Sequence, residues 1–132
     1  MDRALTEALA PVLRDLGNSG SVIPRVEDGQ WSDFEDQVTA MLFSPGGSGQ
    51  GVSAMAGEPL PQRIASVADQ VQEWAVEELC SIGRPTNWPP CPQHPHSHPL
   101  SAVVREGQAV WSCPKTGYVA GGIGQLGQDR DG

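Results

Sequence analysis

The stretch that decides the fold begins at residue 88 and reads Trp88-Pro89-Pro90-Cys91-Pro92-Gln93-His94-Pro95-His96-Ser97-His98-Pro99-Leu100. A second, shorter run follows it and reads Cys113-Pro114-Lys115-Thr116-Gly117. These two runs hold all 3 histidines and two of the 3 cysteines of the chain. Thiolate and imidazole are the side chains that zinc prefers. The last third of the chain is therefore where metal chemistry is expected.

Residues 100–113, between the two Cys-Pro turns, predict a β-hairpin that turns at Glu106 and Gly107. With a two-residue turn, one face of the hairpin is apolar and is expected to be buried: Leu100, Ala102, Val104, Ala109, Trp111 and Cys113. Glutamate disfavours positive φ, so a bulged turn that uses Gly107 is an open alternative, and a slip of one residue would invert the two faces. Residues 118–126 add a third strand, which its glycines weaken.

The two turns resemble those of a zinc ribbon of the rubredoxin-like kind, in which Cys-Pro-x-Cys turns before and after a hairpin each supply two ligands. The resemblance covers about the last third of the chain. Cys91 and His94 stand in the places of the first pair, and Cys113 in that of the third ligand. Thr116 occupies the place of the fourth, and Gly117 is expected to take the left-handed conformation that such a turn requires. The ending is also similar to that of small proteins of high-GC bacteria, which implies no activity.

A structural zinc ion needs four ligands, so the two turns are one ligand short. His96 or His98, a water or another chain would have to supply the fourth. In a flat strand, residues 94, 96 and 98 project from the same face, whereas in a polyproline helix they diverge. The candidate metal ligands are Cys91, His94, His98 and Cys113.

The alternative is a degenerate ribbon that has lost its metal and is held by Trp111, Leu100 and the proline turns. A disulfide between Cys91 and Cys113 is a further alternative that the sequence leaves open. Zinc is the one cofactor that the pattern indicates.

Two amphipathic helices are predicted before this region. In residues 2–16 apolar side chains recur three and four apart; Pro11 is expected to kink or divide this helix, and Gly17 to end it. Residues 58–82 predict a longer helix that packs on a hairpin. Its apolar stripe consists of Leu60, Ile64, Val67, Val71, Trp74, Leu79 and Ile82. Cys80 beside the stripe is expected to be a small buried side chain.

Strands are predicted between the two helices. Residues 22–26 indicate an extended piece that its proline restricts to a sheet edge, with a turn at 27–29. Residues 31–43 fit a helical stripe and also have the composition of a strand. The turn-rich loop at 44–51 and a strand at 52–56 after it favour a β-hairpin.

The expected fold class is therefore α+β, in one domain of 132 residues. It comprises an N-terminal helix, a β-hairpin, a long amphipathic helix and a C-terminal three-stranded, zinc-ribbon-like β meander. Within it, residues 1–87 form the α/β part, residues 88–126 the ribbon-like subdomain and residues 127–132 a disordered tail.

The net charge of -8 disfavours direct binding to nucleic acid or to an anionic membrane. A charged partner is expected to be a protein with a basic surface. The sequence has no apolar run of membrane-spanning length and no basic leader, and its odd number of cysteines suits a reducing compartment, so a cytoplasmic location is expected.

Catalytic motifs are weak. Cys91 or Cys113 beside His94 would make a thiolate-imidazole pair, but the sequence marks no orienting acid or oxyanion site. Residues 122–127 match a dinucleotide fingerprint without a helix after it to hold the pyrophosphate, and residues 46–51 lack the ending of a phosphate loop. We therefore expect no catalytic and no cofactor-binding residues.

The first hypothesis is a non-catalytic, acidic protein-interaction or accessory module that carries a degenerate zinc ribbon. An exposed apolar patch around Trp31 or Trp88 would support it. One alternative is a zinc-binding protein with a Cys/His site. Another is an acidic mimic that inhibits a nucleic-acid-binding protein.

Overall fold

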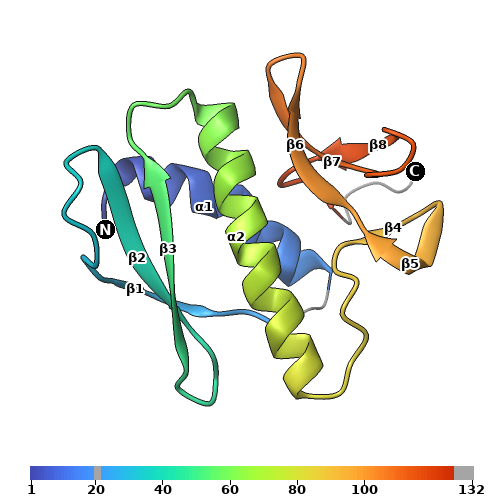
Figure 1. The fold of residues 1–132 in the computed structure, drawn as a ribbon, viewed down its shortest axis with the longest axis horizontal. Helices are drawn as coiled ribbons and strands as arrows, with labels where there is room; N and C mark the ends of the chain where they lie inside the picture. Colours follow the sequence, from blue (N-terminus) through green and yellow to red (C-terminus); the bar gives the residue numbers. More distant parts are fainter. Residues whose placement is uncertain (20–21, 127–132) are drawn as a thin grey trace.

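The computed structural model describes residues 1–19 and 22–126 of the chain. The elements run in the order α1 (Arg3–Asn18), β1 (Arg25–Asp28), β2 (Gln37–Phe43), β3 (Gly49–Met55), α2 (Leu60–Ser81), β4 (Pro90–Cys91), β5 (His94–Pro99), β6 (Ser101–Arg105), β7 (Gln108–Ser112) and β8 (Val119–Gly122). The strands form three antiparallel sheets with the orders β1-β2-β3, β4-β5 and β6-β7-β8 (Figure 1). The predicted α+β class is confirmed. The predicted tail, 127–132, lies outside the described residues.

Helix α1 continues through its internal proline. Asp2 caps its first turn, with Oδ1 accepting a hydrogen bond of 2.8 Å from the amide of Ala4. The sequence predicts a kink or a division at Pro11 and an end at Gly17, but the helix is undivided and runs to Asn18. A proline inside a helix costs about 3 kcal/mol. Burial on both sides of it offsets that cost, because each fully buried leucine or valine contributes about 1.5–3 kcal/mol; these residues are Leu5, Leu9, Val12 and Leu16.

The first sheet has one strand more than the predicted hairpin. Strand β1 begins directly after Pro24 and lies at an edge, as the proline requires. The predicted turn at 27–29 is wrong in part, since Glu27 and Asp28 extend β1 and pair with β2. The ambiguous residues 31–43 divide into a loop and strand β2. Alternate side chains of β2 and β3 turn inward and are buried: Ala40, Leu42, Val52 and Ala54.

Helix α2 packs against α1, β3 and β6, and Figure 1 shows it between the first and the third sheet. The middle of the predicted stripe is buried, whereas Leu60 and Ile82 at its two ends are exposed. Gly83, at φ 73°, ends the helix in a Schellman motif in which the amide of Arg84 bonds to the carbonyl of Leu79. Cys80 is exposed, contrary to the prediction, because it lies on the solvent side of the helix next to the buried Leu79.

The predicted register of the C-terminal hairpin is confirmed. Arg105 pairs with Gln108, so the turn has two residues, Glu106 at φ 51° and Gly107 at φ 78°. Positive φ at both positions is typical of a type I′ turn, whose twist fits the two strands. Leu100, Trp111 and Cys113 are buried on the predicted face. The opposite face is buried too at Val110 and Ser112, which the pattern does not predict.

A buried carboxylate joins the C-terminal sheet to α1. Asp15 has no exposed surface and accepts hydrogen bonds from the indole N–H of Trp111 at 2.8 Å and from the amides of Gly124 and Leu126 at 2.7 Å and 3.0 Å. Trp111 also meets the ring of Trp88 edge-on, with the centroids 5.6 Å apart. Residues from both halves of the chain belong to one apolar core, and the candidate metal ligands lie at its margin.

Within the described part of the chain, neither helix is long and apolar enough to cross a membrane.

Candidate metal centre

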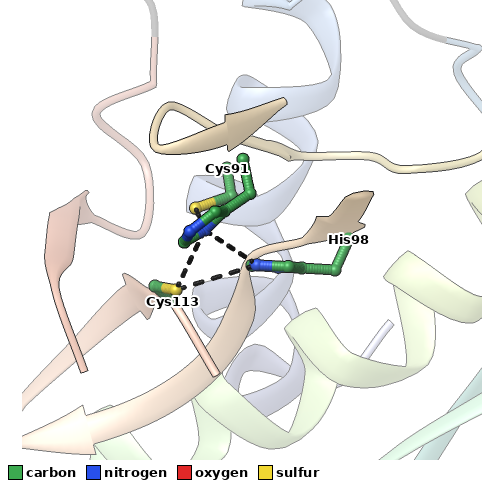
Figure 2. Close-up of side chains that lie close together, drawn as sticks. Cys91, His98 and Cys113 are labelled. Carbon is green, nitrogen blue, oxygen red and sulfur yellow. Dashed lines mark hydrogen bonds between the residues drawn. The ribbon is translucent and has the colours of Figure 1, made fainter. Parts of the chain in front are cut away.

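Four side chains from three separate positions in the chain meet beside the apolar core. Cys91 ends β4, His94 and His98 lie in β5, and Cys113 follows β7. The thiol sulfurs and one nitrogen of each imidazole all lie within 4.8 Å of one another (Figure 2). The structure thus brings together all four candidate ligands that the sequence indicates, and together they could hold a metal ion.

The first turn explains why His98 joins the cluster and His96 does not. Cys91 pairs with His94 across a tight turn, while Pro90 pairs with Pro99, so the two residues of β4 face the two ends of the six-residue β5. The residues between His94 and Pro99 therefore bulge away from β4. A flat strand would place residues 94, 96 and 98 on the same face, but the bulge leaves His96 exposed and turns His98 back toward His94.

The second turn supplies one ligand and a link between the turns. The amide of Gly117 donates to the carbonyl of Cys113 at 2.9 Å, and Gly117 takes the predicted left-handed conformation at φ 80°. Thr116 stands outside the four-residue cluster. Its hydroxyl donates to Oε1 of Gln93 at 2.9 Å and accepts from the amide of Tyr118 at 3.2 Å. The residue in the place of the missing ligand thus ties the second turn to the first.

The separations of the ligand atoms agree with a tetrahedral zinc site. With Zn–S about 2.3 Å and Zn–N about 2.0 Å, a tetrahedron holds sulfur and nitrogen about 3.6 Å apart and two nitrogens about 3.3 Å apart. Nδ1 of His94 lies 3.7 Å from Sγ of Cys91 and 3.8 Å from Sγ of Cys113. Nε2 of His98 lies 3.9 Å from Sγ of Cys113 and 3.1 Å from Nδ1 of His94. One ion at the centre can therefore reach all four atoms.

A neighbouring carbonyl sets the tautomer of His98. Nδ1 of this ring lies 3.0 Å from the carbonyl oxygen of Pro99, to which it can only donate. The proton is therefore held on Nδ1, and the lone pair of Nε2 points into the cluster. Metal-binding histidines commonly have this second hydrogen bond, because it fixes both the ring orientation and the tautomer.

The environment of Cys113 favours its thiolate. Burial raises the pKa of this thiol, but hydrogen bonds from the amides of Thr116 and Lys115 and from the thiol of Cys91, together with the nearby hydroxyl of Thr116, outweigh burial and lower the pKa from 9.0 to about 6. Zinc binds the thiolate and not the thiol. At neutral pH Cys113 is therefore already in the form that binds metal.

Both cysteines of the cluster are buried free thiols, so the disulfide alternative is not realised in this structure. The two imidazoles are partly buried and close the side toward solvent. A metal ion held by all four side chains would have a complete tetrahedron of protein ligands, with no position for water or substrate.

The sequence missed two features that position this centre. The hydroxyl of Thr116 connects the two turns through Gln93, and the carboxylate of Asp15 anchors Trp111 from a distant helix. A polar residue in the apolar stripe of the first helix was the available signal for Asp15. No sequence signal indicated the link from Thr116 to Gln93, because this link depends on how the two turns meet in space.

No protein-family model, no curated protein and no solved structure matches this chain.

Proposed function

We propose that the protein binds one Zn²⁺ ion through Cys91, His94, His98 and Cys113, and that the ion has a structural role in a non-catalytic module. The observation that carries this proposal is the geometry of the four ligand atoms. Four of their six separations are 3.1–3.9 Å, close to the edges of a zinc tetrahedron, and all six lie within 4.8 Å. The resemblance of the two turns to a zinc ribbon supports the same ion.

The donor set favours zinc over other cations. Two thiolates and two imidazoles in a tetrahedron suit Zn²⁺, while Mg²⁺ and Ca²⁺ take oxygen ligands. Thiol ligands also require a reducing environment to stay unbridged, which supports the proposal of a cytoplasmic location.

The ion would stabilise the ribbon, which has few apolar contacts of its own in β4 and β5. Strands β4 and β5 are short and bulged, and no residue of β5 is fully buried, although Cys91 of β4 belongs to the apolar core. Bound zinc would cross-link this segment to Cys113 at the end of β7. Because such a site does not exist in the unfolded chain, the free energy of metal binding adds to the free energy of unfolding.

A protein partner remains the second part of the proposal. Trp88 is 4% exposed, which weakens the prediction of a patch around it, whereas Trp31 is 48% and Phe34 75% exposed. Trp31 already has contacts within the first sheet. Its indole N–H donates to the carbonyl of Ala40 at 3.0 Å, and its ring lies against Gly51. Trp31 therefore covers the outer face of the first sheet, and of these two side chains Phe34 is the freer to make an apolar contact with another protein.

Metal content tests the zinc proposal. The protein, purified without a histidine tag and without added metal, is expected to contain near-stoichiometric zinc by elemental analysis. Cys91→Ser and Cys113→Ser are expected to lose it, because each removes one of four ligands. The matched controls are Cys80→Ser and His96→Asn, which change an exposed cysteine and an exposed histidine outside the cluster.

Two results would contradict the proposal. One is native protein without zinc whose Cys91→Ser and Cys113→Ser variants remain folded. The other is equal loss of zinc from His96→Asn and His98→Asn, since the structure assigns only the second of these histidines to the cluster.

A further inference from the structure

A groove runs along the outward side of α2 and reaches Pro99, the residue next to the candidate metal ligand His98. Three adjoining hollows form it, of about 520, 90 and 400 Å³, and Glu77 lines all three. The largest extends from Gln50 in β3 to Pro99 in β5, and the third continues past Cys80 to Thr86. The groove therefore follows α2 between the first and the second sheet.

The groove is acidic. Glu73 and Glu77 are exposed on its floor, and Glu78 lines the smallest hollow, where it accepts a hydrogen bond from Ser44. None of the residues that line the three hollows is basic. Within residues 1–19 and 22–126, the ion pairs do not include Glu73 or Glu77. A ligand of this groove is thus expected to be cationic.

A buried donor lines the same groove. Trp74 is 2% exposed and lines the smallest hollow. Its indole N–H has no hydrogen-bond partner among the described residues. Buried N–H groups are almost always paired, so this donor calls for an acceptor such as a carbonyl oxygen. The groove therefore suits a ligand that carries both positive charge and carbonyl groups.

Gly49 and Gln50 of the edge strand β3 form one wall of the groove, and Gly51 lies next to them outside the three hollows. Strand β3 is an edge strand, and the amide side chain of Gln70 bonds to both the N–H and the C=O of Ser53, as a neighbouring strand would. Residues two apart in a strand point the same way, so the N–H and C=O of Gly51 and Gly49 face outward too. These glycines accommodate aromatic rings on the outer face of the sheet, and without side chains they leave the backbone edge uncovered.

We propose that this groove binds an extended, basic segment of a partner protein. The segment adds a strand to β3 at Gly49 and Gly51, its lysine or arginine side chains meet Glu73 and Glu77, and one of its carbonyls accepts from Trp74. Main-chain pairing provides affinity in this mode of recognition, and the side chains provide specificity. Carboxylates in the groove repel nucleic acid and anionic lipid, so a protein segment is the occupant that the charges favour.

Binding of a model peptide to the zinc-loaded, full-length protein tests this proposal. The probe is a fluorescein-labelled, acetylated peptide of about six residues in which arginine and threonine alternate. On titration we expect nuclear magnetic resonance shifts at the indole N–H of Trp74 and at the amides of Gly49 and Gly51. The double variant Glu73→Gln/Glu77→Gln is expected to weaken binding roughly fivefold to tenfold, because it removes two exposed charge pairs.

Two controls separate this site from general charge attraction. Asp33→Asn/Glu35→Gln changes the net charge equally but lies outside the three hollows, so its affinity should equal that of the native protein. A peptide N-methylated at every residue has no main-chain N–H to donate to a strand edge and should not bind. The proposal is overturned by no binding at millimolar peptide, by equal weakening in the two double variants, by equal binding of the N-methylated peptide, or by shifts confined to other residues.

Discussion

In the first part of the chain the structure is held by apolar side chains that repeat with the period of a helix or a strand, whereas residues 88–126 depend on a few specific polar contacts. Leu9 and Leu42 are fully buried members of repeating patterns, and the neighbouring apolar side chains of each pattern are buried as well. In the second part, the bonds that Trp111 and Gly124 make to Asp15 of α1, and the cluster around Cys113, have no such substitutes among the described residues. We therefore expect single substitutions in the first part to lower the stability less than single substitutions in the second part.

Removal of zinc is expected to have the largest effect. It would release the bulged β4 and β5 from Cys113 and lower the free energy of unfolding by more than about 3 kcal/mol. Hydrogen exchange before and after chelation is the measurement: amides of residues 90–113 should lose protection, while those of β2 and α2 keep most of theirs. Uniform loss of protection throughout the chain would contradict this account, because it would show that zinc stabilises both parts equally.

Asp15→Asn is expected to have the next largest effect, about 2–3 kcal/mol. Asparagine keeps one acceptor oxygen, but its NH₂ group would face N–H donors that now bond to the carboxylate, so at least one buried donor is left unpaired. Thermal unfolding measures the loss, and the indole resonance of Trp111 shows whether the contact has changed. Asp33→Asn, on the surface, is the control, and an equal stability of both variants would contradict the role given to Asp15.

Most of the helices and strands before residue 88, and the four candidate metal ligands, could be predicted from the sequence. Both predictions rest on local patterns. The apolar period of residues 58–82 and the turn at Glu106 and Gly107 depend only on near neighbours. Local patterns offered no geometric reason to prefer His98 to His96, since that preference depends on the bulge of residues 95–98 between the pairs Cys91–His94 and Pro90–Pro99.

Long-range contacts account for the remaining differences. The end of α1 beyond Gly17 and the burial of Asp15 depend on segments that approach from the other end of the chain, as in the bond from Asn18 to the carbonyl of Leu126. The exposure of Cys80 depends on which side of α2 the sheets cover. Periodicity alone does not contain this information.

Gly117→Ala is expected to cost about 1 kcal/mol. A Cβ here would meet only Arg105, at 3.7 Å, so the cost comes from the φ of 80° and not from a clash. Thermal unfolding and zinc content are the measurements, and the turn at Cys113 should retain zinc with a lower affinity. Gly57→Ala is the matched control, because a Cβ at that exposed glycine meets nothing within 4 Å. Equal stability of the two variants would show that the turn does not need its left-handed residue.

Stability is also expected to decrease as the pH falls from 8 to 6.5. The pKa of Cys113 is 9.0 when unperturbed and about 6 in the fold, so in this window the unfolded chain binds a proton that the folded chain does not. Stability from this group is therefore fully present above pH 9 and is lost as the pH falls through about 6. The thermal midpoint of metal-free protein should be lower at pH 6.5 than at pH 8, and metal-free Cys80→Ser should show the same slope. A midpoint that rises toward pH 6.5 would contradict the lowered pKa.

X-ray absorption at the zinc edge tests the proposed centre most directly. Protein purified without added metal is expected to show two sulfur neighbours at about 2.3 Å and two nitrogen neighbours at about 2.0 Å, and His98→Asn should lose one nitrogen or the metal itself. A native spectrum with fewer than two sulfurs, with an oxygen in place of a histidine nitrogen, or without zinc would contradict a closed structural site formed by Cys91, His94, His98 and Cys113.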